Sequence, residues 1–176
     1  MELNNNLFHL PLNEIKLYGN DNLVYGSLTT NGINSLVKLI NKYIYSNING
    51  FDLGCGDGEL IYHLGILLPG SIWEGVEISN HRINNQKRDV MIWQGDFLEE
   101  NFRPYNILHI DNVCFSDYLN HKLEEKISNE FNGIVIIYKK ITNENLLRKS
   151  LFLEQKIIEA SWNNHTIYLY YINNSS

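Results

Sequence analysis

Glycines and carboxylates stand close together in one short segment, residues 52–58, which reads DLGCGDG. Glycines at this spacing let the backbone turn sharply, and they let a ligand lie against bare main chain. The dinucleotide-binding pattern G-x-G-x-x-G is not met, because Glu59 stands where the third glycine would be. Carboxylates here would repel a pyrophosphate but attract a ligand that carries an ammonium and a sulfonium. The candidate ligand-binding residues are Asp52, Gly54, Gly56 and Gly58, with Asp57 as a further acid; a glycine turn without a ligand is the alternative.

Two more acids lie where predicted strands end. Glu77 ends a stretch that reads GVE, and it is placed to accept hydrogen bonds from both hydroxyls of a ribose. Asp96 follows the next strand, where its carboxylate can bind an adenine amino group while Phe97 covers the ring. Taken alone, such an acid is more often a solvated strand end. The three strand-end features in this order, at domain-scale spacing, predict S-adenosylmethionine as the cofactor.

The residues after the fourth predicted strand are candidates for the chemical step, because ligands gather outside the carboxyl ends of parallel strands. Methyl transfer from a sulfonium is an in-line displacement, so an enzyme has mainly to position the reactants, exclude water and remove a proton. The candidates are Asp111, Asn112 and Phe115. No Asn-Pro-Pro-Tyr run follows this strand, which argues against nucleobase amino groups as acceptors. For Asp111 the alternative is an acid near a helix N-terminus, and Cys114 is expected to be a buried filler.

Apolar strands alternate with helical patterns along most of the chain, which is typical of a parallel sheet covered by helices. We expect an α/β fold: a Rossmann-like sheet of the class I methyltransferase type, with parallel strands, a C-terminal antiparallel hairpin and helices on both faces. Residues 1–22 form a short polar segment, and residues 23–176 a single domain. Strands are predicted at 48–53, 72–78, 90–94, 106–110 and 133–138 (the last a central strand), and the hairpin at 154–161 and 166–172.

Three amphipathic helices are expected, one before the first of these strands and two between later ones. The first begins after Thr29 or Thr30 as N-cap. Their inward-facing residues are predicted to be Ile33, Leu36, Val37 and Ile40 in the first helix, Leu60, Ile61, Leu64 and Leu67 in the second, and Leu119, Leu123 and Ile127 in the third.

The charge of the chain bears on its partners. The 176 residues are 44% hydrophobic and 19% charged, and the net charge is −6. A protein that grips nucleic acid by its phosphates normally has a basic surface, so strong direct binding of nucleic acid is not expected. An acidic chain approaches a basic partner more easily, such as a lysine-rich protein.

The cysteines and the apolar runs indicate where the chain works. Cys55 and Cys114 are far apart and have no metal-ligand spacing, so no metal site is predicted, and reduced thiols suit an intracellular protein. No apolar run approaches the ~18 residues of a membrane span, and the first residues lack a signal-peptide pattern. We therefore expect a soluble intracellular protein without membrane contact, in the nucleus or the cytoplasm.

Six segments are similar to motifs of the disruptor-of-telomeric-silencing family, the histone-lysine methyltransferases outside the SET-domain class. Residues 24–29 (VYGSLT) resemble the family's opening V-Y-G-E-[IL]-T, and residues 110–115 (IDNVCF) resemble its V-N-N-x-x-F. The glycine loop, residues 75–77 (GVE) and residues 95–98 (GDFL) also correspond to motifs of the family. Ser161-Trp162 with Tyr168 and Tyr170 is similar to its terminal S-W…Y-Y hairpin. The resemblance spans residues 23–171.

The resemblance implies roles for several residues. Tyr25 and Thr29 would help to hold the methionine part of the cofactor, and Asp111, Phe115 and Tyr168 would line a narrow channel for a lysine side chain. Ordinary hairpin packing is the alternative for the tyrosines, one of which would then be core. Ser27 replaces the family's glutamate, and Asp111 replaces its first asparagine.

The resemblance implies methylation of a lysine in a basic protein, a histone or nucleosome. Since a fold does not fix a substrate, methylation of a small molecule or an RNA is the first alternative. A catalytically inactive relic that binds the cofactor, or has lost it, is the second.

Overall fold

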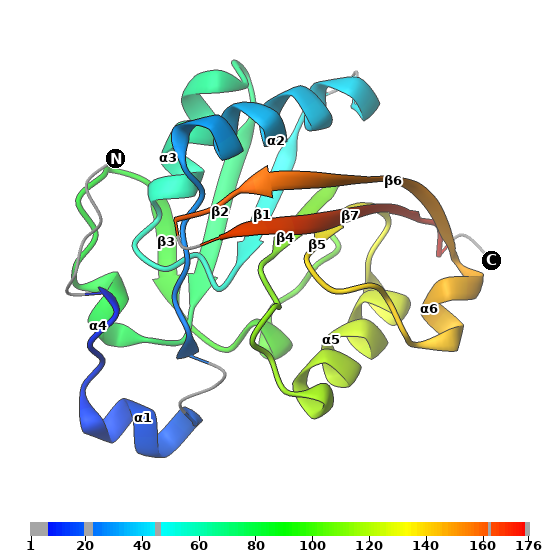
Figure 1. Ribbon diagram of the computed structural model, residues 1–176. Helices are drawn as coiled ribbons and strands as arrows, with labels where there is room; N and C mark the ends of the chain where they lie inside the picture. The colour runs from blue at the N-terminus through cyan, green and yellow to red at the C-terminus, as the bar shows by residue number, and fades with distance from the viewer. Residues whose placement is uncertain (1–6, 20–22, 45–46, 162, 175–176) are drawn as a thin grey trace.

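The computed structural model describes residues 7–19, 23–44, 47–161 and 163–174. Within these residues the chain forms one seven-stranded sheet in the order β3-β2-β1-β4-β5-β7-β6 (Figure 1). The strands β1 to β5 are parallel to their neighbours, while β7 runs antiparallel to β5 and to β6. The predicted fold class is confirmed. The strands are β1 (Asn49–Leu53), β2 (Ile72–Glu77), β3 (Met91–Gln94), β4 (Ile107–Ile110), β5 (Gly133–Ile137), β6 (Ser150–Glu159) and β7 (Asn164–Ile172).

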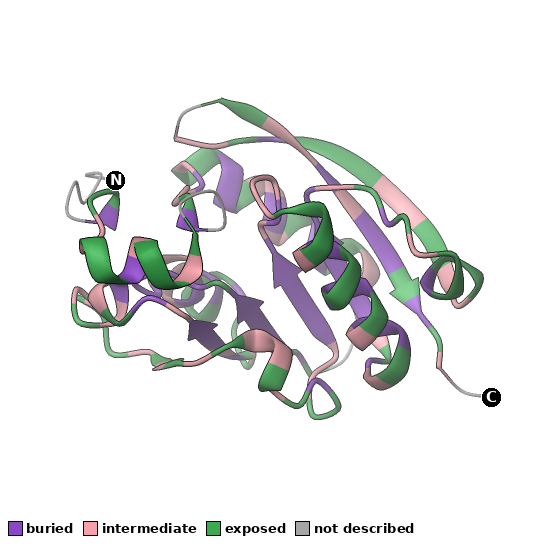
Figure 2. Cartoon of the chain, turned by 90° about the horizontal axis from the view of Figure 1, so that it is seen from below, coloured by how far each residue is buried: buried purple, intermediate pink, exposed green. Residues whose placement is uncertain are grey.

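Helices cover both faces of this sheet, as Figure 1 shows. On one face lie α2 (Thr30–Tyr43) and α3 (Glu59–Leu67), and on the other α5 (Asp117–Glu130) and α6 (Glu144–Arg148). Viewed from the side of α5, the strands beneath the helices are buried (Figure 2). The predicted central strand β5 lies between β4 and β7, and four of its five residues are fully or nearly fully buried. Both faces of β5 are therefore packed, which explains its continuous apolar sequence.

The first helix begins as predicted. Thr29 is the N-cap of α2, and its hydroxyl oxygen accepts a hydrogen bond from the Gly32 amide at 3.2 Å. The buried face of α2 contains Ile33, Leu36 and Ile40, while Val37 is only partly buried.

In α3 the prediction was partly wrong. Ile61 and Leu64 are buried, but Leu67 is 40% exposed. Leu67 is the last residue of the helix.

The segment before α2 is tied to the C-terminal hairpin. Leu28 forms an antiparallel bridge with Ala160, and the Ser161 amide donates to the Ser27 carbonyl at 2.8 Å. The predicted first strand of the hairpin extended to residue 161, whereas β6 ends at Glu159. Residues 160–161 pair with the segment before α2 instead, which holds Tyr25 beside the carboxyl edge of the sheet.

An additional helix, α1 (Leu12–Tyr18), lies in the polar N-terminal segment. Its Glu14 is buried and accepts hydrogen bonds from the Ser79 hydroxyl at 2.6 Å and the His81 amide at 3.1 Å. Both partners stand at the start of α4 (Asn80–Ile83), directly after β2. These contacts fasten the N-terminal segment to the edge of the sheet where Glu77 lies.

Candidate functional site

The glycine loop turns sharply between β1 and α3. Gly54, Gly56 and Gly58 all have positive φ angles, of +84°, +60° and +79°, which side chains rarely adopt. A Cβ atom at Gly56 would lie 2.5 Å from the ring of Tyr25, and one at Gly58 would lie 2.7 Å from Val90. At Gly54 nothing lies within 4 Å. Gly54 is therefore the glycine of this loop that faces open space, while the other two are packed against side chains of the protein.

A cavity of about 180 Å³ opens at the carboxyl ends of β1 to β4. Its wall is formed partly by the rings of Phe97 and Phe115, which stack at 5.6 Å with an interplanar angle of 15°. The structure brings seven of the predicted site residues together around this cavity: Tyr25, Gly54, Glu77, Asp96, Phe97, Asp111 and Phe115. They come from segments far apart in the sequence, as the predicted parallel topology requires.

A smaller cavity of about 50 Å³ adjoins the first, and Tyr25, Gly54 and Asp111 line both. The predicted cofactor residue Asp52 lines it as well, and so do Asp57 and Glu59. The Tyr25 hydroxyl donates a hydrogen bond to Asp57 at 3.1 Å. Burial raises the pKa of Asp57, although this hydrogen bond opposes the shift. The small cavity is thus rich in carboxylates, as a cationic ligand requires.

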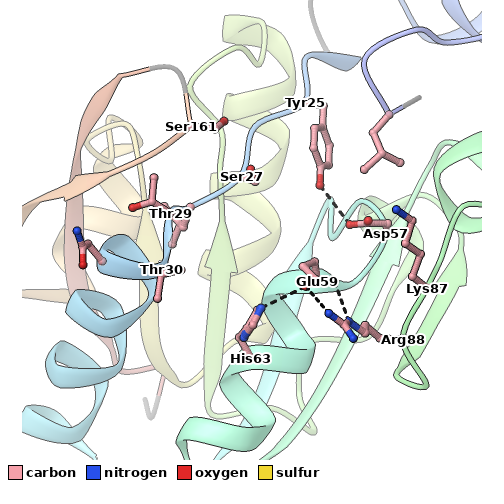
Figure 3. Close-up of a pocket in the computed structure, with 13 residues that line it drawn as sticks. Tyr25, Ser27, Thr29, Thr30, Asp57, Glu59, His63, Lys87, Arg88 and Ser161 are labelled. Carbon is pink, nitrogen blue, oxygen red and sulfur yellow. Dashed lines mark hydrogen bonds and ion pairs between the residues drawn. The ribbon is translucent and has the colours of Figure 1, made fainter. Parts of the chain in front are cut away.

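A third, larger cavity of about 670 Å³ lies on the outer side of Tyr25 (Figure 3). The predicted residue Thr29 lines it together with Tyr25 and Asp57. Figure 3 shows Glu59 between two partners, with His63 at 3.2 Å and Arg88 at 3.2 Å. Thr29 is thus separated from the 180 Å³ cavity, and its side chain serves as the N-cap of α2.

Glu77 is almost fully buried, and several protein groups already use its carboxylate. Its Oε1 accepts from the Ser79 amide at 2.9 Å and pairs with Arg82 at 3.5 Å, and its Oε2 accepts from the Gly56 amide at 2.9 Å. A carboxylate oxygen has about two acceptor positions. Glu77 can therefore accept one ligand hydroxyl at Oε2 in this arrangement, whereas the sequence prediction was of two.

Asp111 and Asn112 differ in what their side chains do. Asp111 lines both cavities, and burial raises its pKa. Asn112 is fully buried: its Oδ1 accepts from the amides of Tyr138 and Lys139 at 3.0 and 2.9 Å, and its Nδ2 donates to Asn120 at 2.6 Å. Asn112 therefore joins the ends of β4 and β5 to α5, and its amide group bonds three protein partners.

The predicted residues of the hairpin lie elsewhere. Tyr168 lines neither the 180 Å³ nor the 50 Å³ cavity; it packs beside the core on the α5 face, with the Lys140 ammonium 5.6 Å from its ring centre. Tyr170 is buried in that core, as expected for one of the two tyrosines. Trp162 lies outside the described residues.

Three polar residues near the site were missed by the sequence analysis. Arg82 contacts Glu77, and it donates to the carbonyls of Leu7 and Leu23 from the N-terminal segment. His109 and Tyr138 are buried beside Asp52. The available signal was the histidine in the otherwise apolar strand ILHI, because a buried polar ring requires hydrogen-bond partners.

Comparisons with known proteins support the fold. No protein-family model matches the chain, and no curated protein matches it. Among solved structures, the PH0226 protein of Pyrococcus horikoshii has a TM-score of 0.60 at 15% identity, over 80% of this chain and 89% of that one. PH1948 from the same organism, a proposed RNA methyltransferase, has a TM-score of 0.55 at 16% identity, over 81% and 83%. A protein from echinomycin biosynthesis, studied for the conversion of a disulfide bond into a thioacetal group, has 0.57 at 12%, over 85% and 87%.

The chain thus shares its Rossmann-like fold with solved structures that include a proposed RNA methyltransferase. In the part of the chain that the structure describes, every helix is too short or too polar to cross a bilayer. The same residues contain no cluster of histidine, cysteine and acidic side chains arranged for a metal ion.

Proposed function

We propose that this chain is an S-adenosylmethionine-dependent methyltransferase and that it methylates the side-chain amine of a lysine in a basic protein, such as a histone. The observation that carries the proposal is the 180 Å³ cavity, at which Gly54, Glu77, Asp96 and Asp111 meet at the carboxyl edge of the sheet. Ligands bind at this edge in open α/β folds. Perturbed titratable groups in such a cavity favour a functional site over a structural one.

The residues present fit the cofactor. The open face of Gly54 leaves space for a ligand against the main chain. Glu77 keeps an acceptor position for a ribose hydroxyl, and Asp96 stands beside Phe97 where an adenine ring would need a polar edge and an apolar face. Asp52 and Asp57 supply negative charge for the cationic end. When bound, the cofactor supplies a methyl group activated by a sulfonium.

Asp111 is the candidate proton acceptor. A lysine amine is protonated at neutral pH and must lose a proton before it can act as a nucleophile. An ordinary carboxylate is a weak base, but burial raises the pKa of Asp111 and so strengthens it as a base. The stacked rings of Phe97 and Phe115 form an apolar wall beside it, which restricts water near the reacting groups.

The choice of a basic protein as substrate rests on charge and on the resemblance of residues 110–115 to the lysine methyltransferase motif. The net charge of −6 favours a basic partner over a polyanion. A second candidate is an RNA or a small molecule, because the similar structures include a proposed RNA methyltransferase and a protein of echinomycin biosynthesis. A cofactor-binding protein without activity is a third.

Methyl transfer from radiolabelled S-adenosylmethionine separates these candidates. The chain is incubated with free histones, nucleosomes, total RNA or a small-molecule extract, and the labelled fraction is identified. We expect label on histone lysines. Label in RNA or in the extract would instead establish the second candidate, and cofactor binding by calorimetry without any label would establish the third. The variant Gly54→Leu, in which a side chain fills the ligand space, is the negative control.

A further inference from the structure

We propose that His109 is a positioning residue for the cofactor: with Tyr138 it holds the carboxylate of Asp52 so that this group receives the ammonium at the amino-acid end of S-adenosylmethionine. The inference rests on the proposed function, because it concerns how the same site binds the same cofactor. It adds two residues outside the glycine loop, from β4 and from the end of β5, to the machinery that binds the donor.

The three residues form a continuous hydrogen-bonded chain across the sheet. His109 Nδ1 lies 2.8 Å from Asp52 Oδ1, and His109 Nε2 lies 3.3 Å from the Tyr138 hydroxyl. All three side chains are buried, with relative exposures of 4%, 3% and 6% for Asp52, His109 and Tyr138. Asp52 and His109 are direct partners in the pairing of β1 with β4. His109 is paired with Ile136 of β5, and Tyr138 follows two residues later on the same face.

The protonation states of the chain follow from its hydrogen bonds. An ionised carboxylate only accepts, so His109 Nδ1 carries the hydrogen and donates it to Asp52. Burial holds the pKa of Tyr138 well above its ordinary value, so the phenol keeps its proton and can donate it to Nε2. The imidazole thus bonds both neighbours, and the arrangement fixes Asp52 in one orientation.

The second oxygen of Asp52 is left for a ligand. Among the described residues it has no hydrogen-bond partner, although Asp52 is 96% buried and lines the 50 Å³ cavity. The lining of this cavity also includes Asp57, Glu59 and Asp111, and it includes no lysine or arginine. An oxygen that opens into this cavity can accept from a cation or another donor. A cavity of this size holds a group no larger than a few water molecules, which suits an ammonium.

The two cavities together match the two ends of one ligand. Gly54 lines both, and no atom within 4 Å occupies the space over its Cα. A ligand that crosses Gly54 would present its nucleoside to Glu77 and Asp96 and its amino-acid end to Asp52. A role of His109 in core packing alone would explain the burial. It would not explain why a polar ring replaces an apolar residue between Leu108 and Ile110, opposite the acid of the glycine loop.

Two ligands distinguish positioning from packing. S-adenosylhomocysteine carries the amino-acid end, and 5′-methylthioadenosine lacks it, so only the first can use Asp52. For His109→Leu we expect the Kd of S-adenosylhomocysteine to rise about 10- to 100-fold, as for loss of a hydrogen-bonded charged contact. The Kd of 5′-methylthioadenosine should change less than about threefold, since the nucleoside contacts remain. Calorimetry at constant pH measures both constants.

Conservative variants keep the test valid if His109→Leu fails to fold. In His109→Asn the side-chain amide can donate to Asp52 in place of Nδ1, so most of the S-adenosylhomocysteine affinity should return. Tyr138→Phe removes only the hydroxyl and should weaken S-adenosylhomocysteine about 3- to 10-fold, again without an effect on 5′-methylthioadenosine.

The outcomes separate this inference from the proposed function. Equal weakening of both ligands in these variants, or no change in either, would overturn the role of His109 while leaving a cofactor-binding protein. If the unaltered chain binds neither ligand, the proposed function fails, and the inference fails with it. Selective loss of S-adenosylhomocysteine together with rescue by His109→Asn would support both.

Discussion

Backbone geometry shapes the glycine-loop side of the candidate site, whereas side-chain hydrogen bonds shape the side formed by the residues after β4. On the first side, the positive φ of Gly54 and the Gly56 amide bonded to Glu77 set the contour of the cavity. On the second side, Asn112 joins the ends of β4 and β5 to α5. The donor half thus depends mainly on a few glycines and acids in one order, with His109 and Tyr138 supporting one of these acids, Asp52. The acceptor half depends on residues that only the tertiary fold brings together.

This difference has a functional meaning. The methyl donor does not change from one substrate to another, so a binding site formed by backbone geometry needs no adjustment. The acceptor varies, and in the proposed function it contacts Asp111 and neighbouring side chains, whose contacts can be exchanged one at a time. Variants in each half should therefore fail in different ways: those of the donor half should lose ligand binding, and those of the acceptor half should lose turnover or stability.

The largest effect is expected at Gly54. In Gly54→Leu a side chain would fill the open space above the loop, and the affinity for S-adenosylhomocysteine should fall by more than about 100-fold. The positive φ adds a stability loss of about 1 kcal/mol. Gly70→Leu is a matched control, because Gly70 has a φ of +82° and open space in the turn after α3. The control should lose similar stability and bind normally; equal affinity in the two variants would refute the assignment of Gly54.

The next effect is on turnover, at Asp111. Asp111→Asn removes the proton acceptor and leaves the shape, so we expect the rate to fall about 100-fold or more while the Kd of S-adenosylhomocysteine changes less than about threefold. Asp117→Asn, at the exposed start of α5, is the control and should be active. Should Asp111→Asn keep full activity, the proton leaves by another route and the asparagine of the lysine methyltransferase motif would be functionally equivalent.

The raised pKa of Asp111 also predicts two pH dependences. Only the ionised carboxylate accepts a proton, so the rate should rise with pH through this pKa. Stability should respond in the opposite direction, because a folded-state pKa above the unfolded value gives a contribution that is complete at low pH and is lost as pH rises through the folded pKa. Asp111→Asn should thus gain stability relative to the unaltered chain at pH 8, and this gain should vanish at a pH low enough to protonate Asp111 in both the folded and the unfolded state. Urea unfolding at both pH values tests the sign.

A smaller effect, on stability alone, is expected at Asn112. Asn112→Leu leaves the buried amides of Tyr138 and Lys139 without their acceptor and should lower the free energy of unfolding by about 2 to 4 kcal/mol. Asn112→Asp keeps the acceptor and loses the donor to Asn120, so its loss should be smaller. If Asn112→Leu instead unfolds like the original chain and is inactive, Asn112 acts on the substrate and not on the scaffold.

The sequence predicted that several candidate residues meet at one edge of the sheet, and the reason is physical. Glycines at fixed spacing and acids at strand ends are local signals, and parallel strands bring their carboxyl ends to one edge whatever the rest of the chain does. Gly54, Glu77, Asp96 and Asp111 accordingly meet at one cavity. The number of hydroxyls that Glu77 can accept was not predictable, because Arg82 and Ser79 use its oxygens through the tertiary fold.

Contacts that link distant segments were less predictable. A histidine in an apolar strand indicated that His109 has a buried hydrogen-bond partner. The identity of this partner, Asp52, depends on the register of β1 with β4, which the sequence does not show. Helix α1 was missed because its few residues are mostly polar and exposed, and its anchor is one buried carboxylate, Glu14. Leu67 was assigned to the core from the helical spacing of apolar residues alone, and this spacing does not show how the last residue of a helix is covered.

The smallest effect is expected at Tyr168, and it tests the boundary of the acceptor half. The resemblance places its ring at a lysine channel, yet its hydroxyl lines neither of the cavities that Gly54 and Asp111 share. Tyr168→Phe keeps the ring beside Lys140 and removes only the hydroxyl, so activity should change less than about threefold. Tyr25→Phe is the contrast: it removes the hydrogen bond to Asp57 between the cavities, and we expect the Kd of S-adenosylmethionine to rise about tenfold. If the rate of Tyr168→Phe fell tenfold with an unchanged cofactor Kd, the acceptor channel would reach β7, and the lysine-type substrate would gain its strongest support.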